Sequence, residues 1–136
     1  MLSSTEEDSP ELKGLIYMAE DDPMVRQLAE TMLRKSGFVI KSFVNGKELI
    51  NALKKRSQED ETIGLFLLDV IMPEMGGVQA FHNIRSLGYD MPVLFMSGYT
   101  EERLQNIADL KDASLIHKPF TMKDLVQKIQ SLKLEP

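Results

Sequence analysis

Four places along the 136-residue chain carry side chains suited to phosphoryl or metal chemistry. Three acids stand together at residues 20–22 (Glu-Asp-Asp), a fourth is Asp69, and Ser97 and Lys118 supply a hydroxyl and an amine. Clustered carboxylates repel one another unless a cation neutralises them, and oxygen ligands without Cys or His favour Mg²⁺ or Mn²⁺. An amine and a hydroxyl nearby suit a phosphoryl group. An aspartate can itself attack phosphorus and form an acyl phosphate.

Short apolar runs predict the strands that would position these side chains. Four runs are nearly continuous, which is typical of strands covered on both sheet faces. They lie at residues 15–19, 65–68, 93–96 and 114–116. Residues 38–43 differ, because Ile40 and Ser42 fall on one side and Val39, Lys41 and Phe43 on the other. That mixture predicts an edge strand.

Apolar residues at helical spacing predict five helices between and after the strands. The first spans residues 23–36, with Asp22 as its N-cap, Pro23 as its first residue and Gly37 as its stop. The others are expected to open at Asn45-Gly46 and to span about 77–87, 100–109 and 121–132. Strands alternating with helices predict an α/β fold with a parallel sheet covered on both faces.

Ligands of such sheets bind beyond the carboxyl ends of the strands. Residues 20–22 follow the first predicted strand, Asp69 ends the third, Ser97 ends the fourth and Lys118 lies beyond the fifth. We therefore expect these side chains to converge. Taken singly, each has a plainer interpretation as a cap, a turn residue or a solvated charge, and for Asp22 we prefer the helix cap. Their coincidence at strand ends favours a site.

Composition excludes several classes of function. The chain has no cysteine, which rules out disulfides and thiolate sites, and we expect its two histidines, His82 and His117, to be surface or packing residues. A net charge of −5 disfavours nonspecific nucleic-acid binding. No apolar run reaches the roughly 20 residues that span a bilayer. We expect a cytoplasmic chain without membrane contact, consisting of a polar lead-in or linker (1–11), one domain (12–133) and a short tail (134–136).

Four motifs carry a resemblance to a known family. They are Ala-Glu-Asp-Asp-Pro at 19–23, Leu-Asp-Val-Ile-Met-Pro-Glu-Met-Gly-Gly at 68–77, Met-Ser-Gly-Tyr-Thr at 96–100 and His-Lys-Pro-Phe at 117–120. With them the chain resembles the receiver domain of two-component response regulators, from about residue 12 to 132. The third and fourth motifs look most like receivers of hybrid histidine kinases, and a stand-alone receiver is the alternative. The resemblance implies a flavodoxin-like, doubly wound, five-stranded sheet of order 2-1-3-4-5 with five helices.

The resemblance also implies a role for each matching residue. Asp69 would be the phosphoacceptor. Mg²⁺, with Mn²⁺ as a substitute, would be bound by Asp21 directly, by Glu20 mostly through water, by Asp69 and by the backbone carbonyl of Ile71.

Ser97 and Lys118 would both contact the phosphoryl group, and the Lys118–Pro119 bond is expected to be cis. Two departures from the family pattern concern regulation. Leu115 stands where many members carry a switch Tyr or Phe. Ile71 and Tyr99 flank the phosphorylation site where some members position water with polar groups, so we hypothesise a comparatively long-lived acyl phosphate.

The implied partner is a histidine kinase or histidine phosphotransfer domain that donates from phosphohistidine. It would dock on the fourth and fifth helices with strand five, or on the first helix, where Met24 and Leu28 either contact the partner or complete the core. The chain would be a signalling domain, monomeric or weakly dimeric, that catalyses only its own phosphorylation and dephosphorylation.

Three alternatives belong to other classes. An FMN binder of the same fold needs a Ser/Thr/Gly-rich loop after strand one, where this chain has three acids that repel phosphate. A phosphatase of the haloacid dehalogenase type needs an Asp-x-Asp pattern after strand one, which is absent. The third is a degenerate receiver that binds a partner without phosphorylation, and the intact Asp69, Asp21, Ser97 and Lys118 set argues against it.

Overall fold

The computed structural model describes residues 15–57, 59–98, 107 and 110–133 of the chain. Within them, five parallel strands form one sheet of order β2-β1-β3-β4-β5. The strands are β1 (Leu15–Ala19), β2 (Val39–Phe43), β3 (Ile63–Asp69), β4 (Val93–Ser97) and β5 (Ala113–His117). The helices of the described part are α2 (Pro23–Lys35), α3 (Gly46–Lys54), α4 (Gly77–Ser86) and α6 (Met122–Lys133). The expected flavodoxin-like architecture and strand order are confirmed.

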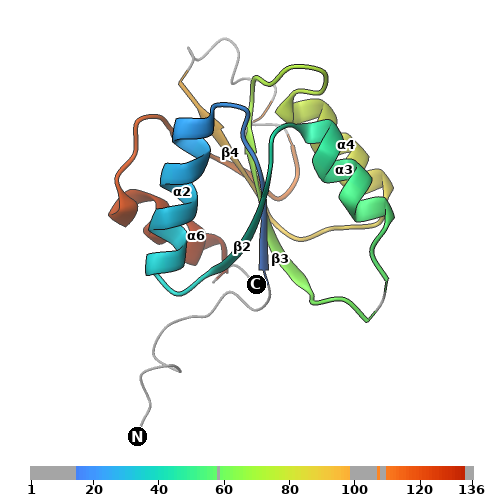
Figure 1. Ribbon diagram of the computed structural model, residues 1–136, viewed down its shortest axis with the longest axis horizontal. Coiled ribbons are helices and arrows are strands. Elements are labelled where there is room, and N and C mark those ends of the chain that lie inside the picture. Colours follow the sequence, from blue (N-terminus) through green and yellow to red (C-terminus); the bar gives the residue numbers. More distant parts are fainter. Residues whose placement is uncertain (1–14, 58, 99–106, 108–109, 134–136) are drawn as a thin grey trace, which may run out of the picture.

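Helices cover both faces of the sheet, as expected for a doubly wound fold. In Figure 1, α2 and α6 lie on one side and α3 and α4 on the other. Each face has its own core: Ile16 and Leu67 point into the cluster under α2 and α6, while Phe66 and Phe95 point into the cluster under α3 and α4. The helix expected near 100–109 falls almost wholly outside the described residues; of it, Ile107 is described and is buried.

The strand predictions were correct in place: β1 has the predicted bounds, β2 begins one residue later than predicted, and β3, β4 and β5 extend beyond their predicted ends. All five residues of β1 and of β4 are buried, as continuous apolar runs predict. Backbone pairing carries β3 from Ile63 to Asp69, beyond the apolar run at 65–68. The expected edge strand, β2, lies at an edge with Val39 exposed, and β5 lies at the other edge with residues 113–115 half-buried.

Helix α2 follows its predicted signals closely. Asp22 is its N-cap, and the side-chain Oδ1 accepts a hydrogen bond from the Met24 N–H at 2.9 Å. The helix ends at Lys35, one residue before the predicted end, and Gly37 follows with a φ of +94° that favours glycine. Leu28 belongs to the apolar pattern of this helix, yet it is 55% exposed and lies outside the core.

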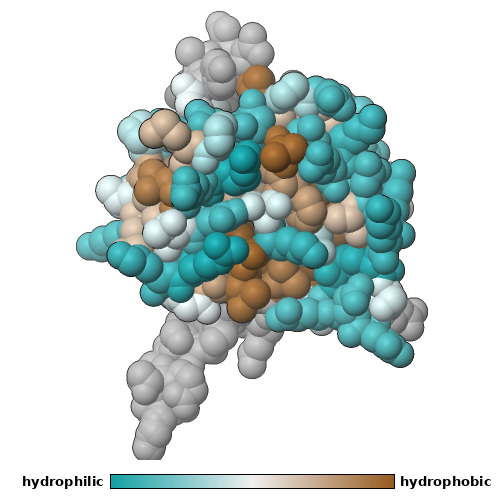
Figure 2. All heavy atoms as spheres, viewed as in Figure 1, coloured by the Kyte–Doolittle hydropathy of each residue, from teal (hydrophilic) through white to brown (hydrophobic). Residues whose placement is uncertain are grey.

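The surface offers few extended apolar areas on the face seen in Figure 2, where hydrophobic residues form small separate patches within a hydrophilic surface. None of the helices in the described part is long and apolar enough to cross a membrane.

Candidate functional site

The register of the sheet brings the predicted site residues to one edge. Asp69 pairs with Met96 across β3 and β4, and Ser97 pairs with His117 across β4 and β5, so the strand ends are level. A cavity of about 510 Å³ opens there. Its lining consists of Glu20, Asp21, Asp22, Asp69, Ile71, Gly98 and Lys118. Six of these seven were predicted to take part in the site or to stand beside it, and Gly98 follows the predicted Ser97.

Lys118 connects two of the acids. Its Nζ lies 3.0 Å from Glu20 Oε1 and 3.3 Å from Asp69 Oδ2. The Glu20 side chain is fully buried, and the Asp69 residue is 6% exposed. Buried ion pairs are strong only when each charge keeps a partner, so losing the ammonium would leave two carboxylates facing each other without compensation.

Burial and mutual repulsion set the protonation of this cluster. Burial, followed by the nearby Glu20 charge, raises the pKa of Asp69 from 3.8 to about 7, although Lys118 acts in the opposite direction. For Lys118, burial would lower the pKa of the amine, but Glu20 and Asp69 outweigh it and raise the pKa above its ordinary value. The ammonium is therefore charged throughout the physiological range, and the carboxylates compete for it.

The acidic turn after β1 is held in place by backbone hydrogen bonds. The Asp22 N–H donates to Glu20 Oε2 at 3.0 Å, and the Arg26 guanidinium donates from Nη1 to the Glu20 carbonyl at 2.8 Å. Sequence reasoning did not identify Arg26. The sequence did contain a signal for it: Arg26 lies in the first turn of the helix that begins directly after the acids, so its guanidinium can reach their backbone carbonyls.

The chain after Asp69 needs glycine for close packing. A Cβ on Gly77 would lie 2.4 Å from the Asp69 carbonyl oxygen, and the Gly77 N–H donates to the Val70 carbonyl at 2.8 Å. The start of α4 therefore rests directly on the backbone of the proposed phosphoacceptor. Sequence reasoning used Gly77 only as a helix start and as part of a motif, because this close approach is a tertiary contact.

Ser97 and Lys118 are tied to each other through the backbone. Ser97 is fully buried at the end of β4, and its carbonyl accepts from the Lys118 N–H at 2.8 Å. The Lys118–Pro119 peptide bond is cis, as expected. Tyr99, predicted to flank the site, lies outside the described residues.

The donor set fits a hard divalent cation. Carboxylate oxygens of Glu20, Asp21 and Asp69 all lie within 4.8 Å of one another. The buried Glu20 Oε1 accepts no hydrogen bond within the described residues, although it lies 3.0 Å from the Lys118 ammonium. Three carboxylates against one ammonium leave excess negative charge when all are ionised. Oxygen ligands and excess negative charge are what Mg²⁺ sites in proteins provide.

Comparison with known proteins gives a consistent result. The sequence profile of the response regulator receiver domain matches residues 16–130. The chain is 30% identical over 118 residues to the response regulator receiver protein CpdR of Brucella abortus, covering 86% of this chain and 94% of that protein. It is 25% identical over 129 residues to the sensor kinase CckA of the same organism, covering 93% of this chain and 13% of the kinase.

The solved structures agree with the sequence comparison. The crystal structure of the receiver domain from the hybrid histidine kinase CckA superimposes with a TM-score of 0.73 and 27% sequence identity, covering 88% of this chain and 99% of that domain. The chain spans nearly all of CpdR but only about half the length of several other curated relatives.

Proposed function

This chain belongs to the family of response regulator receiver domains, and from that premise we propose that it is a phosphoacceptor switch in a two-component phosphorelay. The family consists of signalling domains rather than classical enzymes. The observation that carries the proposal is the position of Asp69, which is buried at the end of β3, 3.3 Å from the Lys118 ammonium and beside two further acids. A nucleophilic carboxylate needs this combination of positive charge and restricted water.

In the proposed reaction, an Asp69 carboxylate oxygen attacks the phosphorus of a phosphohistidine in line with the departing imidazole. The new oxygen–phosphorus bond forms as the nitrogen–phosphorus bond breaks, and the partner's histidine keeps the electron pair. Lys118 stabilises negative charge on the transferring group. Ser97, at the adjacent strand end, donates its hydroxyl to a phosphoryl oxygen.

Mg²⁺ would be held by Asp21, Asp69 and the backbone carbonyl of Ile71, with Glu20 acting mostly through water. When bound, the ion neutralises charge on the transferring phosphoryl group. A cation beside Asp69 also favours the ionised carboxylate, which is the form that attacks phosphorus, and so offsets the raised pKa of that group.

The donor would be a histidine kinase or a histidine phosphotransfer domain, and helix α2 is a candidate contact for it. Met24 is 79% exposed and Leu28 is 55% exposed, so neither completes the core. They line a shallow groove of about 430 Å³ close to the acidic turn. Exposed apolar side chains beside a reactive site suit a transient partner. Similarity to the CckA receiver favours a module of a hybrid kinase, and similarity to CpdR along nearly its whole length keeps the stand-alone receiver open.

The test is the intact mass of the protein after incubation with acetyl phosphate or beryllium fluoride, with and without Mg²⁺. We expect one adduct that requires Mg²⁺ and disappears in Asp69→Asn. Glu74→Gln, an exposed acid on the same loop, is the matched control and should keep the adduct. A wild-type protein that takes no adduct would instead be a degenerate receiver that acts as a binding module.

A further inference from the structure

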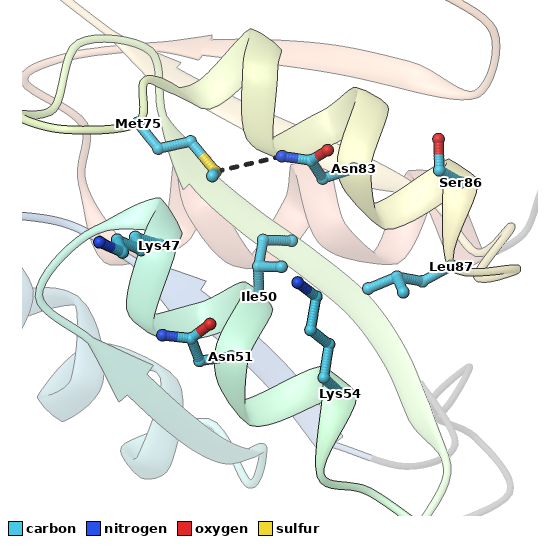
Figure 3. Close-up of a pocket in the computed structure, with 8 residues that line it drawn as sticks. All are labelled: Lys47, Ile50, Asn51, Lys54, Met75, Asn83, Ser86 and Leu87. Atoms are coloured by element: carbon cyan, nitrogen blue, oxygen red, sulfur yellow. Dashed lines mark hydrogen bonds between the residues drawn. The ribbon is translucent and has the colours of Figure 1, made fainter.

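A groove on the opposite side of the sheet from α2 has features that the phosphoacceptor function does not use. It runs between α3 and α4 and has a volume of about 270 Å³ (Figure 3). Ile50, Met75 and Leu87 supply its apolar part, and Leu87 is 40% exposed. In Figure 3 the side chain of Lys54 extends from α3 into the space between α3 and α4.

Several polar side chains that line the groove are available to bind a partner. In the part of the chain that the structure describes, no hydrogen bond or ion pair is made by the side chains of Asn51, Lys54 or Ser86. Lys47 has an ion pair with Glu74, but at 3.9 Å and with both side chains 61% exposed it contributes little. The groove thus presents two cations whose charge the fold leaves largely uncompensated.

The charge of the lining selects among possible occupants. No acidic residue is among those that line the groove, although the whole chain carries a net charge of −5. A second copy packed here about a two-fold axis would place lysines against lysines, which disfavours a homodimer through this face. The lining contains no arginine and no aromatic residue on which a base could stack, which disfavours a nucleic acid.

The spacing of the lysines matches a helix. Lys47 and Lys54 stand seven residues apart on α3, which is two helical turns or about 10.5 Å. A partner helix lying along α3 presents carboxylates at the same interval, with the side chains three and four residues after the first one directed at the apolar floor. An amphipathic helix in a groove is a common mode of recognition.

We propose that the α3–α4 groove docks an acidic amphipathic helix of a partner protein. The helix carries Asp or Glu at two positions seven residues apart, opposite Lys47 and Lys54, and Leu, Ile or Met between them, against Ile50 and Leu87. This surface is separate from the α2 groove assigned to the phosphodonor, so one receiver can hold both partners at once.

The probe is a lactam-bridged helical peptide of about 15 residues, built on alanine, with Glu at i and i+7 and Leu at i+3 and i+4. Titration into ¹⁵N-labelled protein should shift amide signals of residues 47–54 and 83–87 in a saturable way. Lys54→Glu should weaken binding at least about fivefold, and Lys54→Gln should weaken it by a smaller factor. Lys123→Glu, at an exposed lysine on α6 on the other side of the sheet, should leave binding within about twofold.

Several results would overturn the proposal. One is an affinity of Lys54→Glu for the peptide equal to that of the wild type, and another is an equal affinity of the wild type for a peptide with Lys in place of both Glu residues. Amide shifts confined to α2, or no saturable shift at all, would also contradict it. Displacement of the peptide by a single-stranded oligonucleotide at similar concentration would assign the groove to nucleic acid instead. Unchanged far-ultraviolet circular dichroism shows that each variant is folded.

Discussion

At the scale of single residues, the site is defined by an imbalance of charge. Lys118 contacts Glu20 and Asp69, while Asp21 remains exposed at the cavity mouth. One ammonium cannot compensate three ionised carboxylates, and the proposed phosphoryl group would add more negative charge. The arrangement therefore suits a divalent cation, which Glu20, Asp21 and Asp69 would hold and which would supply the missing positive charge.

Ile71 provides a prediction at this scale. Its side chain is 40% exposed and lines the same cavity as Asp69, where it could not hydrogen-bond a water molecule attacking the proposed acyl phosphate. Ile71→Asn introduces a polar group without changing the proposed carbonyl ligand. We expect the half-life of the phosphorylated protein to fall at least about threefold, measured as the decay of the mass adduct after the phosphodonor is removed.

Val44, which is equally exposed but absent from the cavity lining, provides the control. Val44→Asn should leave the half-life unchanged. If Ile71→Asn decays at the wild-type rate, the apolar side chain does not protect the acyl phosphate, and the hypothesis of a long lifetime loses its basis.

At the scale of elements, the register of the strands brings the site residues to one edge of the sheet. The start of α4 packs against the backbone of Asp69 and so restrains the chain that follows it. Gly77→Ala would place a methyl group 2.4 Å from the Asp69 carbonyl oxygen, a backbone atom that cannot move aside cheaply. We expect the free energy of unfolding to fall by about 2–3 kcal/mol, measured by urea denaturation, with slower phosphorylation because Asp69 shifts.

Gly98→Ala is the matched comparison, since among the described residues its Cβ would meet only Lys118 Cβ, at an ordinary 3.9 Å. Its free energy of unfolding should stay within about 1 kcal/mol of the wild type. Equal losses in the two variants would mean that close packing at Gly77 is not what holds α4 against β3.

The two roles available to Asp22 can be separated by substitution. Its Oδ1 caps α2, and its side chain also stands at the cavity. Asp22→Ser keeps a capping oxygen and should retain stability, whereas Asp22→Ala should lose about 1 kcal/mol of unfolding free energy. Both should keep Mg²⁺ affinity within a few-fold, measured by titration calorimetry. A complete loss of Mg²⁺ binding in Asp22→Ser would make Asp22 a metal ligand.

Sequence patterns predicted the elements well because the signals are local. Continuous apolar runs, the Asp22-Pro23 cap and Gly37 located the strands and the first helix within one or two residues. The contribution of Arg26 and the contact beneath Gly77 were missed, because both depend on how a helix meets a strand end. Leu28 fitted the apolar helical pattern, but periodicity does not say which side chains at the edge of a stripe stay exposed.

The convergence of the candidate site residues was predicted for a similar reason, and their chemical roles stay predictions. In a parallel sheet, strand ends share one edge, so residues after consecutive strands must meet once the strand order is fixed. The types of the site residues could be read directly from the sequence, and their proximity followed from the order of the strands in the sheet. The protonation of Asp69 could not be predicted, because it depends on burial and on the distances to Glu20 and Lys118.

At the scale of the whole molecule, the raised pKa of Asp69 makes stability depend on pH. The folded protein keeps the proton up to about pH 7, whereas the unfolded chain releases it near the ordinary value of 3.8. The unfolded state therefore binds fewer protons between these values, and the free energy of unfolding falls as pH rises through this window. Asp69→Asn does not titrate and escapes this loss.

We expect the stability advantage of Asp69→Asn over the wild type, in EDTA, to grow by about 2–3 kcal/mol from pH 5 to pH 8. Urea denaturation at the two pH values measures it. Saturating Mg²⁺ should reduce the advantage at pH 8, because the ion stabilises the ionised wild-type site. An advantage that is the same at both pH values would show that Asp69 titrates normally in the folded protein.

The central claim is that Asp69 receives the phosphoryl group, and chemical trapping tests it most directly. The protein is phosphorylated with Mg²⁺ and acetyl phosphate, reduced with borohydride, digested and analysed by mass spectrometry, which converts an aspartyl phosphate to homoserine at the modified position. We predict homoserine at residue 69 and at no other acid of the site. Homoserine at Asp21 or Asp22, or a phosphoryl group that resists reduction because it sits on a hydroxyl or histidine, would contradict the account.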